Sequence, residues 1–182
     1  MKQIPFLLFF ILIAGMTACH KKDPKPENHP QNESELITTV RLQFIDSASG
    51  DTSSFQFRDP DGEGGNAPLA FDTLKLDANH SYQVSILLLD ESKNPVDTVS
   101  NEVLQESSDH LFVFNVSGAK LGITILDKDN NNLPVGLKTR WRTGNPSQGT
   151  AEVVLRHQPG IKDGTAAPGE SDVDVTFYAV VK

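Results

Sequence analysis

The chain has 182 residues, a formal net charge of −8 and one cysteine. The length fits one domain with a tail, because single domains run to about 100–200 residues. The acidic charge argues against a nucleic-acid binder, which would need a basic face, and a single cysteine excludes an internal disulfide and a cysteine-based zinc site.

The N-terminal segment predicts a signal peptide that ends at the cysteine. Lys2 is followed by a largely apolar run over 6–16, which is too short to span a bilayer but has the length of a signal-peptide hydrophobic region. The run leads into Met16-Thr17-Ala18-Cys19, which resembles a bacterial lipobox, in which the cysteine is acylated and becomes the first residue of the mature protein. We therefore expect residues 1–18 to be a lipoprotein signal peptide and Cys19 to anchor the protein to a membrane. An ordinary secretory signal with an incidental cysteine is the alternative.

Residues 19–34 are predicted to form a disordered tether behind the lipidated Cys19. The stretch HKKDPKPENHPQNES is rich in proline and charge and has no large apolar side chain, so it cannot bury enough surface to fold. We expect it to be extended and to hold the domain off the membrane. Lys22-Asp23 also loosely resembles the charged export signal of Bacteroidetes surface lipoproteins, which implies display at the cell surface.

From residue 35 to residue 182 the pattern predicts one all-β domain. Apolar residues recur at every second position, and turn-forming residues separate the runs, as expected for strands with one buried face. No segment leaves room for the crossover helices of a parallel sheet. We therefore expect an antiparallel β-sandwich of Ig- or fibronectin-like architecture with about 8–9 strands, and a closed up-and-down barrel is the alternative. Residues 96–106 fit either a short helix or a weak edge strand.

Two Asp-rich loops predict calcium sites of incomplete pattern. Calcium takes six to eight oxygen ligands, and a calcium loop supplies them from alternate positions around a sharp glycine turn. Both loops lack the bidentate glutamate of position twelve, where Ala70 and Lys138 stand, so ordinary polar hairpin loops are the alternative. The candidate ligands are Asp59, Asp61, Glu63 and Asn66 in the first loop, and Asp127, Asp129 and Asn131 in the second.

Three histidines lie at strand ends, at positions whose parity points into the sandwich. They are His80, His110 and His157. If two of these ends meet at one rim, their imidazoles could bind a transition metal such as zinc or copper, or the iron of a haem. Histidines bonded to backbone carbonyls at the rim are the alternative.

The remaining motifs do not predict an enzyme. The sequence has no G-x-S-x-G, no H-E-x-x-H and no Gly-rich loop opening a helix, which are the usual signals of hydrolases, metalloproteases and nucleotide binders. Asp172 and Asp174 are expected on the outer face of a strand, as a solvated edge rather than a glycosidase pair. Arg140, Arg142 and Arg156 are expected to point outward and would form a basic patch if their strands pair.

Several stretches resemble a family of small Bacteroidetes outer-membrane lipoproteins. They are 59–68 (DPDGEGGNAP), 90–96 (DESKNPV), Asp109-His110, 127–137 (DKDNNNLPVGL) and 155–159 (LRHQP). The family has no established activity, so the resemblance implies an outer-membrane location and directs attention to the Gly-rich loop, His110 and His157. Its members are often labelled as type 1 periplasmic-binding folds, which implies an α/β protein, and the alternation in this chain contradicts that label.

Together these features predict a lipid-anchored, non-enzymatic β-sandwich that binds a ligand at the outer membrane or cell surface. The ligand could be a metal, haem, a glycan or a TonB-dependent receptor, and calcium is favoured over zinc, copper and haem. A structural or adhesive module without a small ligand is the alternative, and a hydrolase ranks last.

Overall fold

The computed structural model describes residues 36–62 and 65–182. The predicted signal peptide, the tether, Cys19 and Glu63 lie outside the described residues, so the expectations for them stay predictions. Ser34–Lys182 is one compact unit. Every described helix and strand belongs to this unit.

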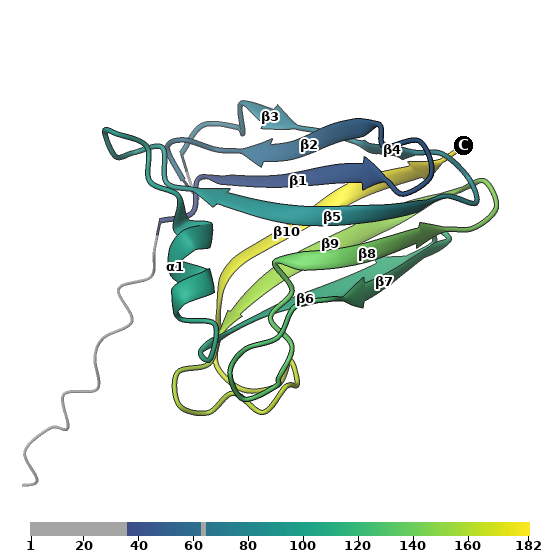
Figure 1. The fold of residues 1–182 in the computed structure, drawn as a ribbon. Helices are drawn as coiled ribbons and strands as arrows, with labels where there is room; N and C mark the ends of the chain where they lie inside the picture. Colours follow the sequence, from purple (N-terminus) through teal and green to yellow (C-terminus); the bar gives the residue numbers. More distant parts are fainter. Residues whose placement is uncertain (1–35, 63–64) are drawn as a thin grey trace, which may run out of the picture. The chain divides into compact units, whose positions relative to one another are not determined.

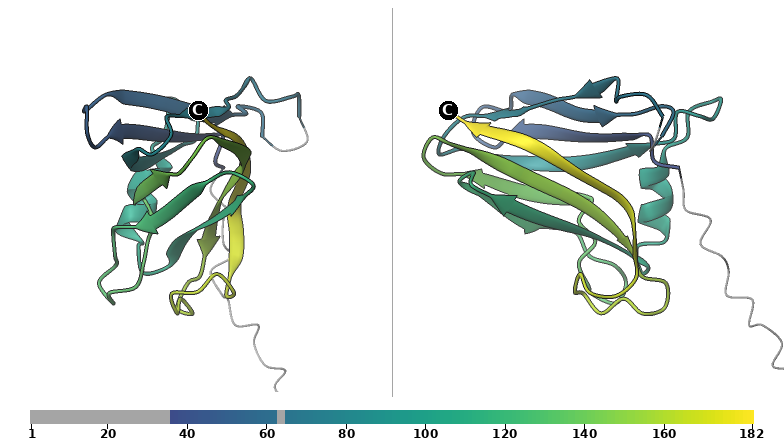
Figure 2. Two further views of the ribbon diagram at one scale, coloured as in Figure 1. Left: turned by 90° about the vertical axis from the view of Figure 1, so that its right-hand side faces the viewer. Right: turned by 180° about the vertical axis from the view of Figure 1, so that it is seen from behind.

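Two sheets pack face to face, which confirms the predicted β-sandwich (Figures 1 and 2). Sheet A has the strand order β3 (Ala70–Phe71), β2 (Thr52–Arg58), β1 (Thr39–Asp46), β5 (Ser81–Leu89), β8 (Lys138–Thr143) and β7 (Leu121–Ile125). Sheet B has the order β4 (Leu74–Leu76), β10 (Glu170–Val181), β9 (Ser147–His157) and β6 (His110–Ser117). All described pairs of these strands are antiparallel except that of β4 with β10. The structure has ten described strands, more than the eight or nine predicted. The strand that the sequence did not predict is β3, which is too short to leave a period-two pattern.

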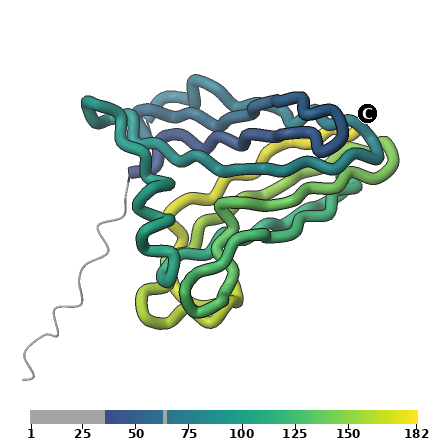
Figure 3. The backbone as a smooth tube through the Cα atoms, viewed as in Figure 1, coloured from purple at the N-terminus to yellow at the C-terminus, as the bar shows by residue number. Residues whose placement is uncertain are grey.

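The ambiguous segment contains a short helix, α1 (Val99–Gln105), beside the end of β5 (Figure 3). The side chains of Val99 and Val103 lie one turn apart and are fully buried, which is the spacing of a helix face rather than a strand. The hydroxyl of Ser100 accepts a hydrogen bond from the backbone N–H of Leu88 at 2.7 Å and so attaches the helix to β5. In the described part of the chain, no helix is both long and apolar enough to cross a membrane.

An aromatic cluster fills the space between the sheets. Trp141 is fully buried, and its indole N–H donates to the hydroxyl of Thr139 at 2.9 Å. The ring of Phe44 meets Trp141 edge-on at a centroid distance of 5.3 Å and Tyr82 at 5.7 Å, which is the favoured geometry for aromatic pairs. Because these rings come from three adjacent strands, the cluster fixes the inner face of sheet A.

Replacing Phe44 with alanine tests the importance of this cluster. We expect Phe44→Ala to lower the free energy of unfolding by about 3–5 kcal/mol, because it leaves a cavity in a closely packed core. The adjacent Ile45 points outward and is 48% exposed, so Ile45→Ala should cost about 1 kcal/mol or less. Urea unfolding followed by the fluorescence of the single, buried tryptophan compares the two, and equal losses would contradict the assigned core.

Candidate metal centre

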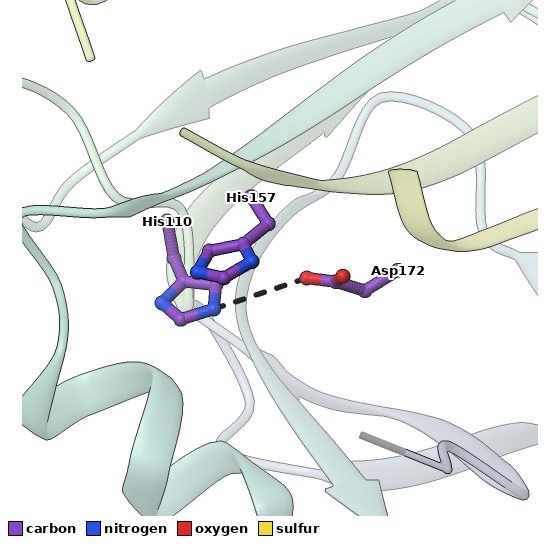
Figure 4. A group of neighbouring side chains, drawn as sticks. All are labelled: His110, His157 and Asp172. Carbon is purple, nitrogen blue, oxygen red and sulfur yellow. Dashed lines mark ion pairs between the residues drawn. The ribbon is translucent and has the colours of Figure 1, made fainter. Parts of the chain in front are cut away.

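The pairing of β6 with β9 brings two of the predicted histidines together. His110 is the first residue of β6, His157 is the last residue of β9, and the two are direct register partners. Since partners in a sheet point to the same face, their imidazole rings stack, with centroids 4.7 Å apart and planes inclined by 8° (Figure 4). The sequence predicted both residues as rim histidines, and the register makes them neighbours.

The end of α1 sets the orientation of the His110 ring. Nδ1 of His110 lies 3.0 Å from the backbone carbonyl oxygen of Glu106, which caps the helix. The carbonyl can only accept, so Nδ1 carries a proton and donates, and Nε2 is the ring nitrogen that is left for a metal ion. A histidine that donates one ring N–H to a backbone carbonyl and aims the other nitrogen at an ion is the usual arrangement in metal sites.

Asp172 completes the cluster, which corrects the expectation that it lies on the outer face. Its carboxylate Oδ2 lies 3.8 Å from Nε2 of His110, and both side chains are more than nine-tenths buried. The cause is a β-bulge, because the pairing of β10 with β9 shifts register between Ser171 and Val173. An extra residue in one strand re-aims a side chain, and Asp172 therefore turns to the histidines while Asp174 stays exposed on the outer face.

The loop between β9 and β10 holds this bulge in place. The guanidinium of Arg156 donates to the backbone carbonyls of Pro168 and Gly169 and to the hydroxyl of Ser171. Gln158 is fully buried, and its amide donates to the carbonyls of Thr165 and Pro168 at 2.9 Å each. These bonds fix the point at which β10 starts.

The cluster offers one ligand atom from each of three side chains, His110, His157 and Asp172, and these atoms all lie within 4.8 Å of one another. Ligands bound to one zinc ion at about 2.1 Å are about 3.4 Å apart at the tetrahedral angle, so binding requires side-chain movements on the order of 1 Å. His157 must also tilt, because an ion lies in the plane of each imidazole that it binds. Its side chain makes no hydrogen bond with the described residues, so it can turn.

A haem held by both histidines does not fit this geometry. A porphyrin held by two axial histidines lies between their imidazoles, whereas the rings of His110 and His157 stack directly on each other. Two nitrogens and one carboxylate instead suit zinc or copper, with room for a further ligand.

A cavity of 530 Å³ between the sheets gives access to Asp172. Its apolar wall includes Leu36, Ile37, Phe57 and Val173, and Asp59 of the first predicted calcium loop lines it as well. Asp59 and Asp172, which are far apart in the sequence, therefore line one cavity.

The first predicted calcium loop is closed by its own hydrogen bonds. Asp61 accepts hydrogen bonds from the backbone N–H and the side-chain amide of Asn66, at 2.8 and 2.6 Å, and these bonds lower the pKa of Asp61. Burial and then the neighbouring Asp61 carboxyl raise the pKa of Asp59. A Cβ at Gly65 would lie 2.5 Å from the Asp61 carboxylate, so a larger residue there would displace that carboxylate from its bonds to Asn66. The pair of Asp59 and Asp61 is suited to share a proton or a cation.

In the second predicted calcium loop, a lysine side chain from another loop already neutralises one of the carboxylates. The Asp129 carboxylate and the Lys162 ammonium form a fully buried ion pair at 2.8 Å. Burial alone would raise the pKa of Asp129, but Lys162 and the backbone N–H of Leu133 outweigh it and lower the pKa. Asp127 accepts the backbone N–H of Gly136 at 2.9 Å. These carboxylates hold the loop together, and we therefore do not propose a calcium ion there.

The third predicted histidine lies at the other end of the sandwich. Ala78, two residues before His80, bonds to the C-terminal Lys182, whereas Glu170 at the start of β10 pairs with His157. Nδ1 of His80 bonds to the carboxylate of Asp46, and this bond raises the pKa of His80 and contributes most to lowering that of Asp46 to about 2. This pair connects β1 to the start of β5 and does not contribute to the metal cluster.

Comparison with known proteins gives no relative. The chain matches no protein-family model, no curated protein and no solved structure. The assignment of a function therefore depends on the geometry.

The pair of His80 and Asp46 should make stability depend on pH. The raised pKa of His80 means that its contribution is complete below about pH 6.5, the ordinary histidine value, and is lost as the pH rises through the higher folded value. The lowered pKa of Asp46 means that its contribution is complete above about pH 4 and is lost as the pH falls toward 2.

We therefore expect His80→Ala to destabilise the domain more at pH 5–6 than at pH 9, where the wild-type histidine is itself neutral. Thermal unfolding of both proteins across this range measures the difference. A loss of stability that is independent of pH would show that the pair has no electrostatic role.

Proposed function

We propose that this protein is a lipid-anchored, non-catalytic β-sandwich that binds a divalent transition metal through His110, His157 and Asp172. The observation that carries the proposal is the convergence of these three side chains at one end of sheet B, with ligand atoms within 4.8 Å of one another. The hydrogen bond from His110 Nδ1 to Glu106 supports it further, because it presents Nε2 as a ligand.

The donor set favours zinc or copper over calcium. Imidazole nitrogens suit zinc and copper, whereas calcium prefers an all-oxygen shell of six or more ligands. Three protein ligands leave a coordination position for water or for a group carried by a second ligand. The cavity that Asp172 lines would admit such a ligand.

The location at the outer membrane is supported by the sequence of the N-terminal segment. The apolar run ending in Met16-Thr17-Ala18-Cys19 is the basis for the anchor, and the resemblance to small Bacteroidetes lipoproteins agrees with it. A metal-binding domain on a tether of this kind would hold its ion, or a ligand bound through that ion, close to the membrane.

Metal binding can be tested on the Ser34–Lys182 unit. A ligand selective for the folded state stabilises it, and zinc at about a hundred times its dissociation constant should raise the unfolding midpoint by about 5 °C or more. We expect His157→Ala and Asp172→Asn each to abolish most of this shift. His80→Ala is the matched control, because it removes a histidine at the other end of the sandwich.

Differential scanning calorimetry with zinc, copper, calcium or EDTA reads out the result. The absence of a shift with zinc and copper would overturn the proposal and favour a module without a small ligand. A calcium shift that is lost in Asp61→Asn and kept in His157→Ala would assign the metal to the first Asp-rich loop.

The anchor is tested in the full-length chain. Because Cys19 is the single cysteine, Cys19→Ala should prevent acylation and release the protein from membranes into the soluble fraction. Incorporation of labelled palmitate and membrane fractionation measure the two effects. A variant that still fractionates with membranes would show that the lipobox interpretation is wrong.

A further inference from the structure

The outer face of sheet A carries cationic side chains and, on its described strands, no acidic one. The outward positions follow from the register, in which Arg140 lies opposite Gln83, Gln83 opposite Ile45, and Ile45 opposite Thr52. The cations at outward positions are Arg41, Arg58, Lys138, Arg140 and Arg142. In a chain whose formal net charge is −8, this is a strong local segregation of charge.

Four of these cations form no ion pair within 4 Å among the described residues, although Glu91 also senses the charge of Arg41. Arg58 is neutralised by Glu91 at 2.6 Å. The guanidinium of Arg41 donates instead to the neutral side-chain oxygen of Gln56, at 3.0 and 3.1 Å. Lys138, Arg140 and Arg142 follow one another at every second position of β8, so their charges form a line along that strand.

Neutral polar side chains continue from these cations across the sheet. The row beginning at Lys138 contains Ser85, Gln43 and Ser54 on the successive strands β5, β1 and β2. Two hollows of 400 and 280 Å³ lie on this face, and both are lined by Ile45 and Ser85. The outer face of sheet A therefore has a line of cations on β8. Beside it, on β5, β1 and β2, lie hydrogen-bonding side chains and two shallow hollows.

The outer face of sheet B is different. It carries Lys75 and Arg156, but also Glu152 and Asp174. Cations and acids are mixed there, so the segregation is a property of sheet A and does not arise from strand structure as such.

We propose that the outer face of sheet A binds an acidic polysaccharide, a polymer whose sugars carry carboxylate or sulfate groups. The cations recognise the acidic groups through charge-assisted hydrogen bonds, and the glutamine, serine and threonine side chains bond the hydroxyls. Within each row, side chains on neighbouring strands are about 4.8 Å apart, which suits an extended polymer lying across the strands.

Two other occupants fit this face less well. Single-stranded nucleic acid needs aromatic platforms for its bases, and the outward positions of the described sheet A strands between Thr39 and Thr143 carry no aromatic ring. A protein interface has an apolar centre, whereas the apolar side chains Ile45, Leu87 and Leu89 at outward positions of β1 and β5 each lie in a row with polar or cationic side chains.

Affinity electrophoresis of the Ser34–Lys182 unit tests this proposal, in EDTA to keep it independent of metal binding. Dextran sulfate and polygalacturonate in the gel should retard the protein, and uncharged dextran should not. Lys138→Gln with Arg140→Gln should weaken this binding about tenfold or more. The control pair, Lys75→Gln with Lys182→Gln, removes the same charge from β4 and from the residue that follows β10, and should change the affinity by less than about twofold.

A second pair of variants separates recognition from simple charge attraction. Gln43→Ala with Gln83→Ala leaves the net charge unchanged and should still weaken dextran sulfate binding. The proposal is overturned if neither acidic polymer binds, or if the control pair loses as much affinity as the β8 pair. Polyglutamate or anionic phospholipid vesicles that bind as tightly, with no effect of Gln43→Ala and Gln83→Ala, would overturn it in favour of an acidic peptide or a lipid surface. Circular dichroism of each variant confirms that it is folded.

Discussion

The register of β9 with its two neighbours is the constraint on which the rest of the structure depends. β9 lies in the middle of sheet B and pairs with β6 on one side and β10 on the other. A shift of one residue would turn every side chain to the opposite face. It would expose Val153 and Leu155, and it would also separate His110 from His157. The hydrophobic core and the candidate metal centre therefore have one cause, because the burial of the aliphatic stripe sets the position of the histidines at its end.

The bulge in β10 is the single irregularity that changes the chemistry of this end. Without it, Asp172 would have the same outward parity as Asp174. The hydrogen bonds of Arg156 to the loop carbonyls and to Ser171 fix the start of β10, and the longer, regular pairing from Val173 onward fixes the remainder. The extra residue is accommodated between these two anchored stretches. The backbone geometry of the bulge and the contacts that fix it thereby hold a carboxylate beside two imidazoles.

Alternation in the sequence was sufficient to predict the strands and the parity of His110 and His157, because one buried face dictates a period of two. It could not reveal Asp172, since a bulge leaves no mark in a polar stretch such as Glu170-Ser171-Asp172. It also could not show that Lys162, more than thirty residues away in the chain, neutralises Asp129. Such pairings depend on which loops the topology brings together. For the same reason, the sequence indicated that Asp59 and Asp61 belong to one loop but could not show that Asp59 and Asp172 line the same cavity.

The charged face of sheet A shows why a net charge describes a β-sandwich poorly. Strands send every second residue to one side, so Lys138, Arg140 and Arg142 point outward together while Thr139, Trp141 and Thr143 are buried between them. Local alternation therefore predicts that Arg140, Arg142 and Arg156 all face solvent.

Whether these three arginines form one patch depends on which sheet each strand belongs to. Arg156 lies on sheet B with Glu152 and Asp174. Arg41 joins the patch instead, through the pairing of β1 and β8 with opposite edges of β5. An overall charge of −8 is thus compatible with a face that attracts anions, because attraction at contact is set by the charges within about a Debye length, roughly 8 Å at physiological salt, and the outward positions of the described sheet A strands carry no acidic side chain.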